Sequence, residues 1–257
     1  MFRGNLPLGE DKHLPTQEGN NLPFLVLFLS YEYLRGLGGK FGMPIHDVTP
    51  LERALLFGQV PSLTLQHALY HAGQVNWYDV GATMFYFLHF AFPLILGYLF
   101  WVVDRRTFIR FSRALIGMAF AAFVFYLFVP VAPPWKAVPG VVKIIDHTLP
   151  SFTDLPGVPV PATVYHWLTP NSYAAMPSLH AAFPLLGSLF ALRHWGMRAW
   201  PTLLYTACVW FSIVYLGEHY VVDILGGAVF VAGTFLLEDL FTQMWARRAA
   251  RSARPSS

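Results

Sequence analysis

The sequence predicts an all-α, polytopic integral membrane protein with six transmembrane helices, and three observations lead to that fold class. Charged residues make up only 12% of the 257 residues, whereas soluble proteins carry about 25%. Hydrophobic residues make up 55%, and the mean hydropathy is +0.47. Apolar stretches long enough to cross a bilayer, which takes roughly 20 residues, recur along the chain. This composition excludes a disordered chain, a nucleic-acid-binding domain and an ordinary soluble enzyme.

Six stretches are predicted to cross the membrane, and they form one domain over residues 22–243. The first, residues 22–37, is interrupted by Glu32 and Arg35. We expect it to be an uncleaved helix, because about twenty polar residues precede it and no clear signal-peptide cleavage site follows. The other five stretches are nearly free of charged residues, and they are 80–103, 114–132, 171–192, 200–217 and 220–237.

The distribution of Lys and Arg predicts that both termini are cytoplasmic, since short loops rich in these residues stay on that side. The cytoplasmic side then holds an N-terminal tail (1–21), a basic C-terminal tail (244–257) and two loops. Its cations are Arg3, Lys12, Arg105, Arg106, Arg110, Arg113, Arg193, Arg198, Arg247, Arg248, Arg251 and Arg254. The external, periplasmic or lumenal side of a plasma or inner membrane holds Arg35, Lys40, Arg53, Lys136 and Lys143.

Two long loops are predicted on the external face. In residues 38–79 the leucine spacing indicates short amphipathic helices that lie on the membrane surface. Residues 133–176 are rich in proline, so we expect them to resist regular structure and to act as a lid or binding loop. Cys208 is the only cysteine, which excludes an intrachain disulfide.

Three ionisable residues, His180, His219 and Asp223, are expected to meet at the external ends of the apolar stretches. His219 and Asp223 are four residues apart, which places them on one face of a helix. Asp223 can then accept a hydrogen bond from one nitrogen of His219 and direct the other outward. The chain between His180 and His219 is long enough to cross the membrane and return to the same face.

The type of chemistry follows from what surrounds these residues. Pro177 suits the first turn of a helix, and Ser178 adds a hydroxyl at a helix N-terminus that favours phosphate. Two imidazoles, a carboxylate and an anion site favour phosphoryl transfer through a phosphohistidine. A zinc site made of the two histidines, Asp223 and Glu218 is one alternative. A transporter with a histidine proton relay is another, although that would place ionisable groups at mid-membrane.

The sequence resembles a known family at these residues. Pro177-Ser178-Leu179-His180 and Gly217-Glu218-His219-Tyr220-Val221-Val222-Asp223 are similar to the second and third motifs of the type 2 phosphatidic acid phosphatase superfamily. The resemblance implies a six-helix core, an external active site and no metal or other cofactor. It also implies that His219 is the nucleophile, that Asp223 orients it, and that His180 protonates the leaving alcohol.

The chain departs from the usual family pattern in its cations. Leu179 stands where the second motif has Gly, Ser212-Ile213 stands where the third has Ser-Arg, and the first motif is not recognisable. We expect Lys136 to replace one missing phosphate-binding cation, with Lys143 a poorer candidate. Gly226-Gly227, which follows the third motif, predicts close helix packing.

One branch of the superfamily is more similar. Ala132-Pro133-Pro134-Trp135 and His89-Phe90-Ala91-Phe92-Pro93 resemble segments of sphingomyelin synthases and fungal inositol phosphorylceramide synthases. This resemblance covers about residues 75–240 and implies transfer of a phospho-headgroup from a membrane phospholipid to a lipid or alcohol acceptor. If water is the acceptor, the enzyme is a lipid phosphate or polyprenyl phosphate phosphatase. The residues expected to bind substrate are Ser178, Lys136, Trp135, Glu218, His89 and Tyr220.

Overall fold

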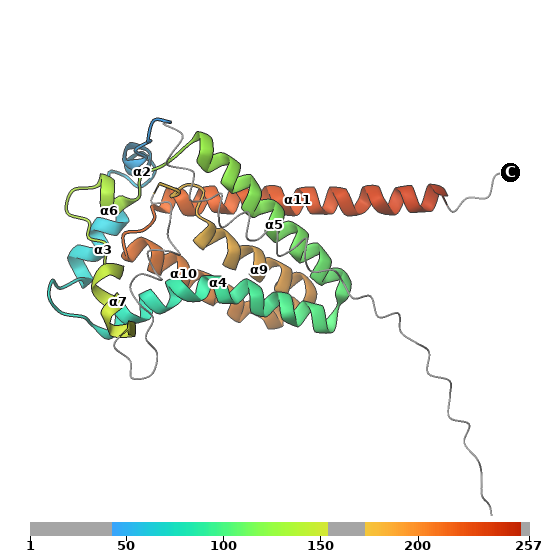
Figure 1. Cartoon of the computed structure of the whole chain (residues 1–257), viewed down its shortest axis with the longest axis horizontal. Helices are drawn as coiled ribbons and strands as arrows, with labels where there is room; N and C mark the ends of the chain where they lie inside the picture. The colour runs from blue at the N-terminus through green and yellow to red at the C-terminus, as the bar shows by residue number, and fades with distance from the viewer. Residues whose placement is uncertain (1–42, 154–172, 253–257) are drawn as a thin grey trace, which may run out of the picture.

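The computed structural model describes residues 43–153 and 173–252 (Figure 1). In these two ranges every regular element is a helix, apart from two isolated β-bridges. The first predicted span (22–37), the N-terminal tail, part of the proline-rich loop and the end of the C-terminal tail lie outside the described residues. The α-helices are α2 (Thr49–Leu55), α3 (Pro61–Leu69), α4 (Trp77–Val103), α5 (Arg105–Phe128), α6 (Pro134–Ala137), α7 (Ile145–Thr153), α9 (Leu179–Trp195), α10 (Trp200–Tyr215) and α11 (Val221–Ser252), and a short 3-10 helix, η1 (Gly196–Ala199), joins α9 to α10.

Three of these helices are long and apolar enough to cross a membrane: α4, α5 and the Val221–Met244 part of α11. The sequence predicted six spans. Of the other three, one lies outside the described residues, and α9 and α10 have 17 and 16 residues. At about 1.5 Å per residue these two helices are roughly 25 Å long, which is shorter than the bilayer core of about 30 Å.

The ends of several helices differ from the predicted spans. α9 begins at Leu179 instead of residue 171, because Ser178 caps it by accepting a hydrogen bond from the backbone N–H of Ala181 (3.2 Å). α5 begins at Arg105, where Asp104 caps it in the same way. α11 continues from residue 237 to Ser252, into the segment predicted as a tail.

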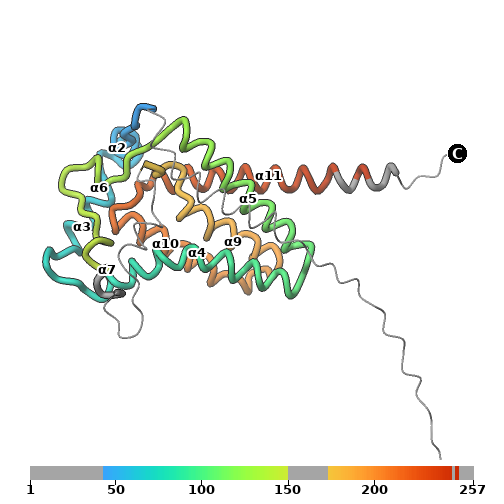
Figure 2. Tube along the Cα trace, in the orientation of Figure 1, coloured from blue at the N-terminus to red at the C-terminus, as the bar shows by residue number. Residues whose placement is uncertain are grey.

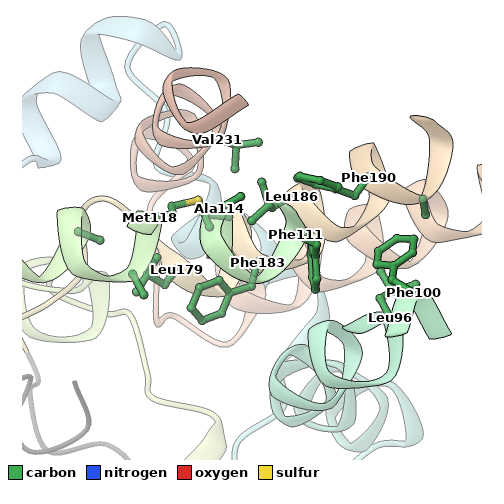
Figure 3. Close-up of a cluster of buried hydrophobic side chains, with 14 of the residues drawn as sticks. Leu96, Phe100, Phe111, Ala114, Met118, Leu179, Phe183, Leu186, Phe190 and Val231 are labelled. Carbon is green, nitrogen blue, oxygen red and sulfur yellow. The ribbon is translucent and has the colours of Figure 1, made fainter. Parts of the chain in front are cut away.

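α9 is the central helix of the bundle, and it packs against α4, α5, α10 and α11. Its apolar residues face all of these neighbours, so most of its side chains are buried. One hydrophobic core lies around it, with Leu96, Phe100, Phe111, Met118, Leu186 and Phe190 among its residues (Figure 3). A second core, which includes Tyr86, Ile144, Ile213 and Tyr215, lies between α4, α7, α9 and α10.

The short helices α2, α3, α6 and α7 gather at one end of the bundle, and we call these four helices the cap (Figures 1 and 2). The structure corrects the expectation that the proline-rich loop is irregular, because α6 and α7 both form within it. Pro134 starts α6, where a missing N–H costs nothing. The tube trace shows the cap beside the N-terminal ends of α4 and α11, while the α4–α5 and α9–α10 turns lie at the opposite end.

The predicted short helices of residues 38–79 are present as α2 and α3, and each buries polar side chains against the protein. The leucines of α3 also pack against the buried clusters. α2 buries Glu52, and α3 buries Ser62 and Gln66. Leu51 and Leu55 of α2 are instead exposed. The polar groups of these two helices are therefore available for contacts within the molecule.

Ion pairs join three helices at the end opposite the cap. Arg110 and Arg113 of α5 contact Glu238 at 3.3 and 2.5 Å. Asp239 lies 2.7 Å from Arg110 and 3.0 Å from Arg193, which belongs to α9. Glu238 and Asp239 belong to α11, so these contacts hold α5, α9 and α11 together. Such charges within an apolar helix are stable because they are paired.

Candidate active site

The structure brings His180 and His219 into direct contact near the cap. His180 lies in the first turn of α9, and His219 lies just before α11. Nε2 of His219 is 3.1 Å from Nδ1 of His180, which is hydrogen-bonding distance. The packing of α9 against α11 thus joins residues that are 39 positions apart in the sequence.

His219 is held in a turn, which corrects the expectation that it shares a helix with Asp223. The backbone N–H groups of Glu218 and His219 both donate to the carbonyl of Ile213 at 3.1 Å. Gly217 precedes them with a φ of +80°, and a Cβ at this position would lie 2.7 Å from the carbonyl oxygen of Val142. A side chain is therefore excluded at residue 217, and the turn aims His219 at α9.

Two acceptors lie beside Nδ1 of His219. The carbonyl oxygen of Ala175 is 3.0 Å away, and Oδ2 of Asp223 is 3.4 Å away. Both accept only, so Nδ1 of His219 carries the proton. In the neutral ring Nε2 then holds the lone pair, and Nδ1 of His180 donates to it. This arrangement directs a basic nitrogen of His219 at a proton of His180.

Asp223 is fully buried in the first turn of α11. Its Oδ2 also accepts from the backbone N–H of Tyr220 at 2.9 Å, which is the reciprocal hydrogen bond of a capping arrangement. The carboxylate therefore has two tasks: it completes the start of α11 and it lies beside His219.

The ring of His180 is packed against two side chains of α4. Tyr86 stacks on it with the ring centroids 4.6 Å apart, and His89 lies at 4.0 Å. His89 is 1% exposed, and its Nδ1 is hydrogen-bonded to the carbonyl of Tyr86. Because His89 lies 12 residues into α4, about 18 Å of that helix extends past the site toward the cap at about 1.5 Å per residue. Measured along α4, His180 and His219 therefore lie inward of the end beside the cap, although they lie at the starts of α9 and α11.

Ser178 serves α9 rather than an open anion site. Its hydroxyl caps the helix at Ala181, its backbone N–H donates to the carbonyl of Asp223 (3.0 Å), and it is fully buried. Pro177 precedes this cap instead of lying in the first turn, and its carbonyl accepts from the Tyr126 hydroxyl of α5. These contacts hold the start of α9 against α5 and α11.

The other predicted binding residues form a group around α6. Nζ of Lys136 lies 4.9 Å from the ring centroid of Trp135 and 4.0 Å from that of Tyr173, which is cation–π geometry. Trp135 packs against the cluster that contains Tyr220. Tyr220 is fully buried, with its hydroxyl 2.8 Å from Thr49 of α2, so it supports the turn from within. Glu218 is half-buried in the same turn. Lys143 forms an ion pair with Asp146 at 3.2 Å.

The site also contains groups that sequence reasoning missed. The carbonyl of Ala175 carries no sequence signal, because any residue supplies a backbone oxygen. Tyr86 is one of many aromatic residues in an apolar helix, so its sequence position did not mark it as part of the site. Within residues 43–153 and 173–252, no three His, Cys, Asp or Glu side chains are arranged to hold a metal ion, so the geometry adds no support for the zinc alternative.

Comparison with known proteins decides the family. The model of the PAP2 superfamily matches residues 46–237, which include all the site residues above. The chain belongs to the PAP2 superfamily. This confirms the family that the two motifs predicted.

Two relatives narrow the resemblance within the superfamily. The chain is 27% identical over 226 residues to the phosphoinositol dihydroceramide synthase of Bacteroides thetaiotaomicron, with 80% of this chain and 71% of the relative aligned. It is 28% identical over 160 residues to the inositol phosphorylceramide synthase of Candida albicans, with 55% of this chain and 32% of the relative aligned. No solved structure matches the chain. The family and the relatives support a lipid-modifying membrane enzyme.

Proposed function

We propose that this PAP2 superfamily member is a lipid phosphotransferase that moves a phosphoinositol headgroup through a phosphohistidine on His219. The observation that carries the proposal is the contact of 3.1 Å between Nε2 of His219 and Nδ1 of His180, with the proton of His219 held on its other nitrogen. The names of the two synthase relatives favour a phosphoinositol-bearing phospholipid as donor and a ceramide-class lipid as acceptor.

The proposed reaction has two steps. Nε2 of His219 attacks the phosphorus of the donor, the bond from phosphorus to the diacylglycerol oxygen breaks, and His180 donates its proton to that oxygen. The acceptor hydroxyl then gives its proton to His180 and attacks the phosphorus, which breaks the bond to His219. Asp223 stabilises the positive charge that develops on the His219 ring.

The superfamily name and the site chemistry also leave a phosphatase as the second candidate, in which water replaces the lipid acceptor. The burial of His219, which is 4% exposed, favours the transferase, because a transferase must keep water away from the phosphoenzyme. We propose that the cap faces the external side and that both termini are cytoplasmic. The charge distribution supports this, since Arg105, Arg106 and Arg198 lie at the end opposite the cap.

The test uses purified protein and a phosphatidylinositol with a radiolabelled headgroup. With a ceramide acceptor we expect labelled product lipid, and His219→Ala and His180→Ala should each abolish its formation. His71→Ala is the matched control, because His71 is an exposed histidine that contacts only its own turn among the described residues. Turnover should persist in the presence of a chelator.

Three results separate the alternatives. Release of free phosphate from a lipid phosphomonoester such as phosphatidic acid, with no transfer from phosphatidylinositol, would identify a phosphatase. Loss of turnover in chelator, restored by zinc, would support the metal site instead. Wild-type turnover in His219→Ala would refute the phosphohistidine mechanism.

A further inference from the structure

Glu52 is a fully buried carboxylate in the cap that the proposed mechanism does not use. Its Oε1 and Oε2 accept hydrogen bonds from the backbone N–H groups of Val221 (3.0 Å) and Val222 (2.9 Å). These residues begin α11 directly after His219. A residue from α2 therefore completes the start of the helix that carries Asp223.

Burial makes the charged form of Glu52 costly unless its oxygens accept hydrogen bonds. Burial, the largest cause, raises the pKa of Glu52, the N–H groups of Val222 and Val221 oppose that rise, and the charge of Asp223 adds to it. Two buried carboxylates thus lie at one helix N-terminus. The first N–H groups of α11 have no acceptor within the helix, and the helix dipole is positive at this end. Both stabilise the two negative charges of Glu52 and Asp223.

Asp223 is the residue whose position depends on this arrangement. Without Glu52, the N–H groups of Val221 and Val222 would be buried donors in need of an acceptor. Asp223 is a carboxylate in the same first turn of α11, and its Oδ1 has no hydrogen-bond partner among the described residues. Rotation of Asp223 toward these donors would draw Oδ2 away from Nδ1 of His219, where the separation is already 3.4 Å.

Neighbouring contacts from the cap act on the same turn. The Ser62 hydroxyl donates to the carbonyl of His219 (3.4 Å), and Gln66 donates to the carbonyl of Tyr215 (2.8 Å). The Thr49 hydroxyl is hydrogen-bonded to that of Tyr220. Polar residues of α2 and α3 therefore hold the turn, and Glu52 alone among these four groups brings a formal charge to it.

We propose that Glu52 is a positioning residue for the reaction, which occupies the first N–H groups of α11 so that the carboxylate of Asp223 stays beside His219. This inference rests on the proposed function, because its test measures the rate of headgroup transfer. It predicts that Glu52 acts on the rate of the chemical step through Asp223, and that it does not act on lipid binding.

The test measures kcat and KM for headgroup transfer in Glu52→Ala and Glu52→Gln, each alone and combined with Asp223→Asn. We expect Glu52→Ala to lower kcat about tenfold or more, with KM for the donor changed by less than about threefold. Glu52→Gln should lie between Ala and the unmodified protein, because its single oxygen can accept from only one N–H. In the Asp223→Asn background, Glu52→Ala should lower kcat less than about twofold, since the interaction it protects is already weakened.

Asp47→Asn is the matched control, because Asp47 is an exposed carboxylate of the same segment whose hydrogen bond is to Thr49 beside it. It should leave kcat unchanged. The thermal unfolding midpoint of each purified variant shows whether it is folded, and Glu52→Gln, which keeps the side-chain shape, replaces Glu52→Ala if the latter fails to fold.

Two results would overturn the inference: an unchanged kcat in a folded Glu52 variant, or an undiminished tenfold loss in the Asp223→Asn background. Its failure can be told from that of the proposed function. If His219→Ala abolishes turnover while folded Glu52→Ala retains it, only the role of Glu52 is refuted. If His219→Ala retains turnover, the mechanism itself is refuted.

Discussion

The proton on Nδ1 of His219 has two acceptors, and their separations show which one orients the ring. The carbonyl of Ala175 is at 3.0 Å, closer than Oδ2 of Asp223 at 3.4 Å. The carbonyl sets the tautomer, because it cannot donate in return. Asp223 adds negative charge beside the ring, which stabilises the cation formed when His219 attacks phosphorus.

This division of labour predicts the effect of Asp223→Asn. The carbonyl of Ala175 keeps the tautomer, so only the charge is lost, and kcat for transfer should fall by about 10²-fold. When an aspartate alone sets the tautomer of a catalytic histidine, its conversion to asparagine lowers kcat about 10⁴-fold. Steady-state kinetics on purified protein measure the difference. A loss as complete as that of His219→Ala would show that Ala175 does not hold the ring.

Packing between α9 and α11 brings the two histidines together, and Gly227 sets how closely these helices approach. A Cβ at Gly227 would lie 2.7 Å from the backbone oxygen of Ser178, the residue that caps α9. The close helix packing that the glycine pair predicted is therefore present in the structure. Because the near atom belongs to the backbone, the start of α9 would have to move to admit a side chain.

Gly227→Ala should therefore destabilise the protein by about 1–3 kcal/mol, the usual cost of overpacking, and should lower turnover by displacing His180. Gly233→Ala is the control on the same helix, because nothing lies within 4 Å of its added Cβ. It should be neutral or stabilise the helix by up to about 1 kcal/mol. Thermal unfolding in detergent and kcat measure both effects. Equal behaviour of the two variants would contradict the close contact.

The molecule has two chemically different ends. The cap lies at one end of the bundle, and the α4–α5 and α9–α10 turns lie at the other (Figure 1). The histidines are near the cap, and the ion pairs to Glu238 and Asp239 involve Arg110 near the start of α5 and Arg193 near the end of α9. Cationic turns favour the cytoplasmic side of a membrane. We therefore expect the cap to face outward.

Cysteine labelling in intact cells tests this orientation. In a Cys208→Ser background, Phe57→Cys in the cap should react with a membrane-impermeant maleimide, since Phe57 is 96% exposed. Met197 lies at the other end of the bundle and is 75% exposed. Met197→Cys should therefore react only after the membrane is permeabilised. The reverse pattern would place the candidate active site in the cytoplasm.

Much of this organisation could be predicted from the sequence, because it depends on local patterns. Apolar runs predicted α4, α5, α9, α10 and α11, because a long run of apolar residues is a local signal for a buried or membrane-spanning helix. The motifs around His180 and His219 predicted the family, and the spacing of His219 and Asp223 predicted that they lie close together. The ends of the helices were less predictable, because caps such as Ser178 decide them.

Other features depend on contacts between distant segments, and only the folded chain reveals them. The leucines of α2 and α3 gave no sign that Glu52, Ser62 and Gln66 would face inward, because the donors and acceptors they meet lie more than 70 residues away. The carbonyl of Ala175 and the stacking of Tyr86 on His180 are likewise results of packing. Residue types and local spacing thus determined which groups could react. Tertiary structure decided their protonation and support, because a buried polar group takes the partner that packing brings to it.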